Sequence, residues 1–459
     1  MNADQGMPCF TDRGERMKSI ILVVALTLMV FLPVVQAPAA EPLGKRILLD
    51  NGMVLLLSEK HTIPMVTVNM AIKAGITAEP EGKAGLASIT ASLLTQGTAR
   101  RTANQISSEI EFVGGGLTVS GGDDFSTAGL TVLTKDLRIG FDLLSDVLMH
   151  PAFEQQEIDR KIKEMLASIQ RQKEEPQVVA SEAFEKAVYG RHAYGRTNED
   201  VAAYLPRLVR QDILDFYAAR YSPNTIIIAV VGDVSEKEII PLIHAYFKGW
   251  KPNNQPLPAA IAPPIMGKTV VQKIDKQVAQ ANIDIGHMGI SRENPDYFAV
   301  SVMNYILGGG GFSSRLMDNI RDNRGLAYDV HSSFAAQKEP GIFTISIQTK
   351  NESANEVIAE TLRELRRIQN EPVLDKELSD AKAYLTGSFP LRMDTFGKIA
   401  SMMTSVEIYN LGLDYPQKYP LIINAITKDD IQRVAKKYLH PDKVVVVVVA
   451  NQEKAKLTY

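Results

Sequence analysis

The feature of this sequence that most restricts its fold is an internal repeat of a helix, a turn and an apolar strand. The first copy spans residues 212–231 and the second spans residues 430–449. Each copy begins with Asp-Ile, reaches Pro-Asn or Pro-Asp at the turn and ends in a run of Ile, Val or Ala. Many αβ units share this outline, but matching residues at a constant offset favour duplication. The repeat therefore predicts two homologous α+β domains.

The chain length and one biased segment suggest where these domains begin and end. At 459 residues, the chain exceeds what a single hydrophobic core usually supports. The proline-rich stretch at residues 252–264 has the composition of a semi-rigid linker. We therefore expect an N-terminal domain at residues 45–251 and a C-terminal domain at residues 265–459.

Residues 1–40 are predicted to form a leader and a secretory signal peptide. Lys18 precedes an apolar run at residues 20–35, and a stretch rich in small residues follows at 36–41. A membrane anchor is the alternative, but the run is short for a bilayer span of about 20 residues. Met17 is a reasonable start of translation, because a polar leader precedes it. We expect an exported, periplasmic protein with no stable membrane span after cleavage.

Charge and cysteine content argue against several kinds of site. With 50 Lys+Arg against 53 Asp+Glu, the formal charge is −3. The sequence has no long run of like charges that would predict binding to nucleic acid. The single cysteine, Cys9, lies in the leader, so the mature chain has no thiolate for a disulfide or a metal. The seven histidines are scattered, with no two on one helical turn, and each is expected to be a surface or capping residue: His61, His150, His192, His244, His287, His331 and His440.

Local patterns indicate how the N-terminal domain begins. Asn51-Gly52 lies between apolar segments at 46–49 and 53–58, and this dipeptide favours a tight β-hairpin because both turn residues need positive φ. Residues 65–73 have the pattern of a strand. Residues 84–95 carry apolar side chains at helical spacing.

The predicted helix at residues 84–95 carries the most informative motif. Residues 85–98 read Gly-Leu-Ala-Ser-Ile-Thr-Ala-Ser-Leu-Leu-Thr-Gln-Gly-Thr. This stretch resembles the zinc helix of the pitrilysin and mitochondrial processing peptidase family, Gly-Leu-Ala-His-x-x-Glu-His-x-x-x-x-Gly-Thr. In that family the two histidines bind zinc and the glutamate activates water. The corresponding positions here are Ser88, Ala91 and Ser92.

The family's third zinc ligand, a glutamate on a later helix, is also missing. The resemblance carries this position to the helix predicted at residues 157–171, near Ser168. Glu164 is close in sequence, but one carboxylate without an imidazole makes a poor tetrahedral zinc site. The resemblance therefore implies that this chain holds no zinc of its own.

A second motif lies in the C-terminal half. Residues 307–316 read Leu-Gly-Gly-Gly-Gly-Phe-Ser-Ser-Arg-Leu, and residues 320–328 read Ile-Arg-Asp-Asn-Arg-Gly-Leu-Ala-Tyr. No Gly-Lys-Ser/Thr follows the glycines, which argues against a phosphate-binding loop. The two segments instead resemble the second-half signature of the same family.

In active members of that family, an arginine and a tyrosine at this spacing hold and polarise the substrate's peptide carbonyl. Arg321 and Tyr328 match them, and a cation with a phenol donor suits the oxyanion formed when water attacks an amide. The alternative is that Arg321 forms a surface ion pair and Tyr328 packs in a core.

The resemblance covers roughly residues 45–450, including scaffold segments at 190–196 and 377–389. It implies an α+β fold of two homologous domains, each a mainly antiparallel sheet packed with helices. It also implies a zinc-less subunit that contributes Arg321 and Tyr328 to a homologous partner, which holds the zinc and cleaves peptides or unfolded proteins.

Other interpretations of the sequence stay open. One alternative is a non-enzymatic peptide-binding or assembly protein on the same scaffold. A self-sufficient peptidase with an unusual metal site is disfavoured, because the ligands and the general base are lost together. The sequence leaves open whether the chain forms a homodimer when alone.

Overall fold

The first half of the chain is built around a six-stranded sheet. The computed structural model describes residues 42–459, so the predicted leader, signal peptide and Cys9 lie outside the described residues. The strands are β1 (Lys45–Leu48), β2 (Val54–Glu59), β3 (Met65–Ile72), β4 (Gly116–Ser120), β5 (Ser126–Leu133) and β6 (Ile226–Gly232), in the order β1-β2-β6-β3-β5-β4. The predicted hairpin is confirmed, because β1 and β2 pair antiparallel on either side of Asn51-Gly52, but the expectation of positive φ at both turn residues is wrong, because Gly52 has φ 86 and Asn51 is not in the positive-φ region.

The second half repeats this design in a five-stranded sheet. Its strands are β7 (Val270–Asp275), β8 (Gln280–Met288), β9 (Ala327–Ala335), β10 (Ile342–Lys350) and β11 (Val445–Ala450), in the order β7-β11-β8-β10-β9. Each sheet has one parallel pair, β2 with β6 and β7 with β11, and its other pairs are antiparallel. The predicted repeat contains β6 and β11. Each of these strands lies between a parallel neighbour and an antiparallel neighbour in its sheet. The predicted α+β fold with two mainly antiparallel sheets is confirmed.

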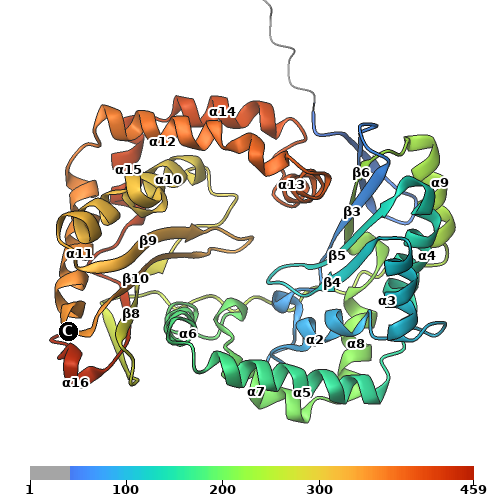
Figure 1. Cartoon of the computed structure of the whole chain (residues 1–459), viewed down its shortest axis with the longest axis horizontal. Coiled ribbons are helices and arrows are strands. Elements are labelled where there is room, and N and C mark those ends of the chain that lie inside the picture. Colours follow the sequence, from blue (N-terminus) through green and yellow to red (C-terminus); the bar gives the residue numbers. More distant parts are fainter. Residues whose placement is uncertain (1–41) are drawn as a thin grey trace, which may run out of the picture. The chain divides into compact units, whose positions relative to one another are not determined.

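Helices cover both sheets (Figure 1). The first-half helices are α2 (Leu86–Leu93), α3 (Ala103–Phe112), α4 (Leu137–Met149), α5 (Gln155–Gln172), α6 (Pro176–Tyr189), α7 (Asn198–Tyr204), α8 (Arg210–Arg220) and α9 (Glu236–Tyr246). The second-half helices are α10 (Tyr297–Asn304), α11 (Ala354–Asn370), α12 (Asp375–Gly387), α13 (Phe396–Ile408), α14 (Tyr415–Ala425), α15 (Lys428–Tyr438) and α16 (Gln452–Ala455). Within residues 42–459, no helix combines the length and hydrophobicity needed to cross a bilayer.

Two helices are exchanged between the halves (Figure 1). α6 of the first half packs on β8 and β11, where Phe184 meets the apolar face of the second sheet. α13 of the second half packs on β3 and β6, and Met403 joins a core that includes Ala229 of β6. Residues 42–459 form one compact unit, so the predicted boundary at 252–264 stays a prediction.

This exchange predicts that neither half is stable alone. Residues 42–251 without α13, or residues 265–459 without α6, would each leave one apolar face of a sheet in water. We expect each fragment alone to lack cooperative urea unfolding, and an equimolar mixture to recover it together with the near-ultraviolet circular dichroism of the whole chain. A fragment that unfolds alone at the midpoint of the full chain would contradict this interpretation.

Candidate functional site

Helix α2, which carries the degenerate zinc motif, is anchored at its first turn by a buried carboxylate. Glu79 is 2 % exposed and accepts a hydrogen bond from the Ala87 amide at 2.8 Å. It also accepts one from Nη1 of Arg196 at 2.6 Å, and Arg196 follows the short helix Ala193–Gly195. The carboxylate is therefore satisfied by a helix N-terminus and a guanidinium. The segment at 190–196, predicted as scaffold, thus holds the motif helix in place.

The positions of the zinc ligands and of the general base on α2 carry small side chains packed close to other parts of the chain. Ser88 and Ser92 are half-buried on α2, and Ala91 is fully buried. The Ser92 hydroxyl donates to the Ile89 carbonyl at 2.8 Å, an ordinary helix back-bond. A Cβ on Gly121 would lie 2.8 Å from the Ser88 Cα, so the β4–β5 connection packs directly on this turn.

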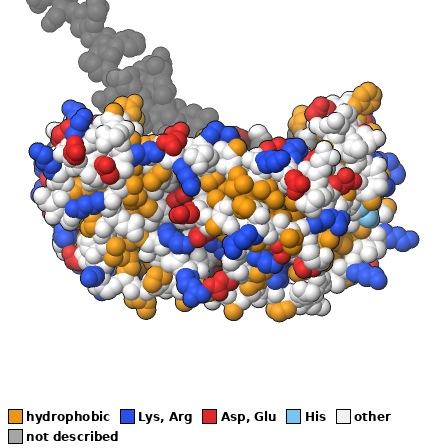
Figure 2. All heavy atoms as spheres, turned by 90° about the horizontal axis from the view of Figure 1, so that it is seen from below, with side chains coloured by type: hydrophobic (Ala, Val, Ile, Leu, Met, Phe, Trp, Pro, Cys, Tyr) orange, Lys and Arg blue, Asp and Glu red, His pale blue; other side chains and the backbone are white. Residues whose placement is uncertain are grey.

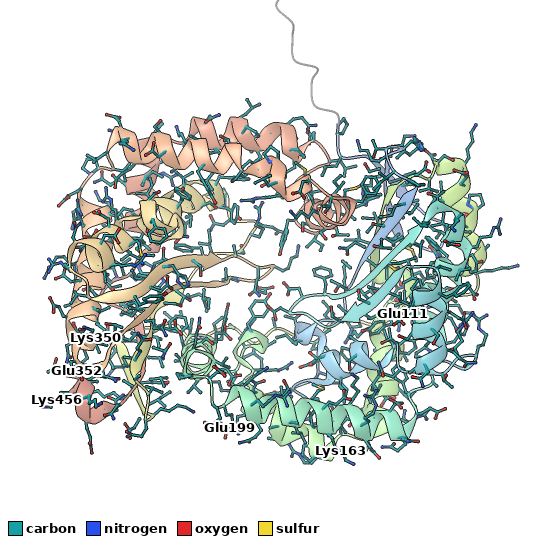
Figure 3. All side chains as sticks on the ribbon, viewed as in Figure 1. Glu111, Lys163, Glu199, Lys350, Glu352 and Lys456 are labelled. Atoms are coloured by element: carbon teal, nitrogen blue, oxygen red, sulfur yellow. The ribbon has the colours of Figure 1, made fainter. Side chains whose placement is uncertain are left out.

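The third ligand position on α5 offers no carboxylate to this site. The Ser168 hydroxyl lies 3.5 Å from Nε2 of Gln172. Glu164 is instead paired on the surface with Arg160 and with Lys161, whose Nζ lies 3.0 Å away, and the bond to Lys161 lowers the pKa of Glu164. The face of α5 that points away from α2 carries charged residues such as Lys163 (Figure 3).

These donor types do not fit zinc. Serine hydroxyls replace the two imidazoles and the carboxylate at the three ligand positions, a methyl group replaces the general base, and thiolates are absent from residues 42–459. Within those residues, no group of three His, Cys, Asp or Glu side chains is arranged to hold a metal ion.

The histidines are less uniform than the sequence suggested. His192 caps the short helix Ala193–Gly195 by accepting from the Tyr194 amide, as expected of a capping residue. The expectation is wrong for His287, which is 2 % exposed and lies with its ring centroid 5.0 Å from that of His440. Its Nε2 accepts from the His440 amide and its Nδ1 lies 2.8 Å from the Met288 carbonyl. Burial lowers the pKa of His287 to about 4, so the ring stays neutral.

Arg321 and Tyr328 are brought together by a short connection at the edge of the second sheet. Arg321 lies in the π-helix Met317–Asn323, and Tyr328 lies on β9. Gly325 takes φ +62 between them, and its amide donates to the Arg321 carbonyl at 2.9 Å, so the chain turns tightly. The Arg321 guanidinium carbon lies 5.9 Å from the centre of the Tyr328 ring.

The backbone at Tyr328 is irregular. Gln348 of β10 pairs with Asp329 and Thr349 pairs with Ala327, so Tyr328 is the extra residue of a β-bulge. Bulges redirect a side chain, and both bulges and π-helices occur often at functional sites. Here the two irregularities flank one glycine and turn Tyr328 outward.

The surroundings of this pair differ from the alternative of a surface ion pair and a core tyrosine. Tyr328 is 70 % exposed, so it does not pack in a core. Arg321 has no ion-pair partner among residues 42–459, and its guanidinium instead lies 4.7 Å from the ring centre of Phe312, which is 71 % exposed. The alternative of a surface ion pair and a core tyrosine is therefore wrong. The catalytic role itself stays a prediction.

Comparison with protein families identifies this architecture. The model for "Insulinase (Peptidase family M16)" matches residues 54–200, and that for "Peptidase M16 inactive domain" matches residues 207–385. The chain belongs to the M16 peptidase family. The predicted membership of the pitrilysin family is thereby confirmed, and the chain is a member without the zinc ligands.

Related proteins match this M16 chain over most of its length. An uncharacterized zinc protease of Streptomyces coelicolor is 25% identical over 403 residues, covering 86% of this chain and 87% of the relative. One of Bacillus subtilis is 24% identical, covering 85% and 93%. A solved M16 inactive domain from Pseudomonas fluorescens is 27% identical, with a TM-score of 0.82, and covers 88% and 98%. A protease from Helicobacter pylori shares the fold, with a TM-score of 0.82 at 20% identity, and covers 89% and 100%.

The anchoring of α2 can be tested by replacing Glu79, with nearby Glu81 as the matched control. Glu79→Ala would leave the Ala87 amide without its acceptor and the Arg196 guanidinium without a carboxylate, with only backbone carbonyls such as that of Ile76 as partners, and should lower the free energy of unfolding by about 3–5 kcal/mol. The comparison is Glu81→Ala, since Glu81 pairs with Arg191 on the surface. We expect that change to leave the urea midpoint close to wild type. Equal losses for the two variants would show that the buried carboxylate does not anchor the helix.

Proposed function

We propose that this M16 chain is the zinc-less subunit of a two-subunit zinc metalloendopeptidase. In this proposal a homologous partner supplies the metal and the general base, and this chain supplies Arg321 and Tyr328. The observation that carries it is the contrast between the two halves. The first half keeps the motif helix without metal ligands, whereas the second half presents a half-buried arginine beside an exposed tyrosine.

Zinc in the partner would activate the water that attacks the scissile amide. The residues of this chain would bind the carbonyl oxygen of that amide. Arg321 has guanidinium N–H groups free of any carboxylate within residues 42–459, and Tyr328 carries a hydroxyl on an exposed ring. Both groups donate hydrogen bonds, and their effect grows as negative charge develops on the oxygen.

The substrate we propose is an extended peptide or an unfolded protein. β9, which carries Tyr328, is an edge strand of its sheet, and β4 is an edge strand of the other sheet. An edge strand offers unpaired backbone donors and acceptors to which an extended chain can add. Addition along β9 would place the new strand beside the bulge at Tyr328.

The cellular setting in this proposal follows from residues 1–40, and we infer export to the periplasm and cleavage of the signal peptide. A nucleic-acid partner is not part of the proposal. On the face drawn in Figure 2, positive and negative side chains are interspersed over residues 42–459 and do not gather by sign.

The decisive experiment measures hydrolysis of an unstructured, internally quenched peptide. The mature chain would be assayed with zinc, first alone and then mixed with a homologue from the same source that keeps His-x-x-Glu-His. We expect only the mixture to cleave. Arg321→Ala should lower kcat of the mixture by about 100-fold to 1,000-fold, because it removes a donor to the oxyanion. Tyr328→Phe should also lower kcat while preserving the ring.

Arg324→Ala is the matched control, since Arg324 is nearby on the same segment but lies 3.4 Å from Glu360 in an ion pair. Its kcat should stay near that of the wild type. Cleavage by the mature chain alone with one bound zinc would overturn the assignment of the metal to a partner. A mixture that neither associates nor cleaves would favour a peptide-binding or assembly protein.

A further inference from the structure

A surface pocket adjoins the Arg321 site but contributes nothing to the chemistry described above. It has a volume of about 380 Å³ and lies between the glycine-rich segment and the first turns of α12. Phe312 lines this pocket and also contacts the guanidinium of Arg321, so the two sites share one aromatic ring. A peptide held at Arg321 would therefore have the pocket beside it.

Part of the pocket wall is apolar, and polar or charged side chains form the rest of it. Tyr305, Ile306, Phe312 and Leu374 line it, and both Phe312 and Leu374 are more than half exposed. Large apolar side chains held in water at a concave surface gain free energy when another apolar group covers them. The pocket therefore suits a side chain with a long hydrocarbon portion.

One carboxylate that lines the pocket, that of Asp318, has no cationic partner within residues 42–459. Arg315 pairs with Glu377 at 2.6 Å, and Lys376 pairs with Asp380 at 2.5 Å, so these two pairs are neutral. Asp318 also lines the pocket, is exposed, and has no ion pair within residues 42–459. The lining residues therefore carry a net charge of −1, while Arg321 lies against Phe312 outside the lining, so Asp318 is the place where a cationic group would pair.

The pocket is held open by its own contacts. Arg315 is 7% exposed and binds Glu377 through Nε and Nη2, a bidentate pair. Glu377 also accepts from the Leu374 amide at 2.7 Å, so one carboxylate caps the start of α12 and binds Arg315 of the glycine-rich segment. A preformed pocket binds its ligand without the entropy cost of ordering the wall.

We propose that this pocket is a specificity subsite for a lysine or arginine side chain of the peptide substrate. The hydrocarbon part of that side chain would cover Phe312 and Leu374, and its cationic end would pair with Asp318. The inference rests on the proposed function, because it assumes that an extended peptide binds at Arg321 and Tyr328. It adds a preference for particular substrate side chains. Arg321 and Tyr328 cannot provide this preference, since in the proposed function they bind a carbonyl of the substrate backbone.

The test measures binding of labelled, unstructured peptides to the full mature chain by fluorescence anisotropy. A single lysine is moved through a Gly-Ser-Ala peptide, and each peptide is compared with one carrying norleucine at that position. Norleucine keeps the hydrocarbon but lacks the charge. At one position we expect lysine to bind about three to ten times more tightly than norleucine, as for a partly screened ion pair beside an aromatic ring.

Asp318→Asn should remove this preference and leave the affinity for the norleucine peptide unchanged. Asp322→Asn is the matched control, because it removes the same charge from the same segment but does not line the pocket. It should keep the preference. A preference retained in Asp318→Asn, or lost equally in both variants, overturns the subsite. Urea unfolding of each variant verifies that the fold is intact.

Failure of the subsite and failure of the proposed function give different results. Peptides that bind, or are cleaved by the mixture with the zinc-motif homologue, equally well with lysine or norleucine overturn the subsite alone. Peptides that neither bind this chain nor are cleaved by the mixture overturn both.

Discussion

The exchange of α6 and α13 between the halves is the constraint on which the rest of the structure depends. Each sheet has an apolar face that its own half leaves uncovered, and the helix from the other half buries it. The two halves therefore cannot change their relation without exposing a core face to water. The chain that leaves α6 continues directly to Arg196, whose contact with Glu79 fixes α2. The packing of α6 on the second sheet thus helps to fix the position of α2, the motif helix of the first half.

The same arrangement reaches the hairpin of the second half that carries Tyr328. Asp124, in the β4–β5 connection, accepts from the Tyr194 hydroxyl at 2.6 Å and from the Lys338 amide at 3.3 Å. Lys338 lies in the connection between β9 and β10, so the bond ties the hairpin of Tyr328 to the first half. The first half therefore contacts the turn of this hairpin, and Tyr328 lies at the opposite end of β9.

Much of this fold could be predicted, because its signals are local. Residues 212–231 and 430–449 repeat a hydrophobic pattern whose period distinguishes a helix from a strand, and Asn51-Gly52 specifies a turn by its backbone preference. The missing zinc ligands were visible for the same reason, since Ser88 and Ser92 occupy fixed positions on one helix.

What could not be predicted depends on contacts between distant segments. The pairing of His287 with His440 arises because β8 lies beside the end of α15, and no local pattern reports it. The bulge at Tyr328 depends on the register of β9 against β10, which the sequence of one strand does not set. The exchanged helices are likewise invisible, because an amphipathic helix shows which of its faces is apolar but not which sheet that face covers.

Four arginines of this chain differ in their partners, and this difference distinguishes structural roles from the proposed functional one. Arg196 and Arg315 are buried or nearly so, and each is neutralised by a glutamate that also holds a helix. Arg324 lies close in sequence to Arg321 and pairs with Glu360. Within residues 42–459, Arg321 alone of these four has no carboxylate and stands against exposed aromatic rings. A guanidinium so placed stabilises the fold little, since its charge is met by ring faces and water. Its donors therefore remain available to a ligand, and this is the property that peptide carbonyl binding requires.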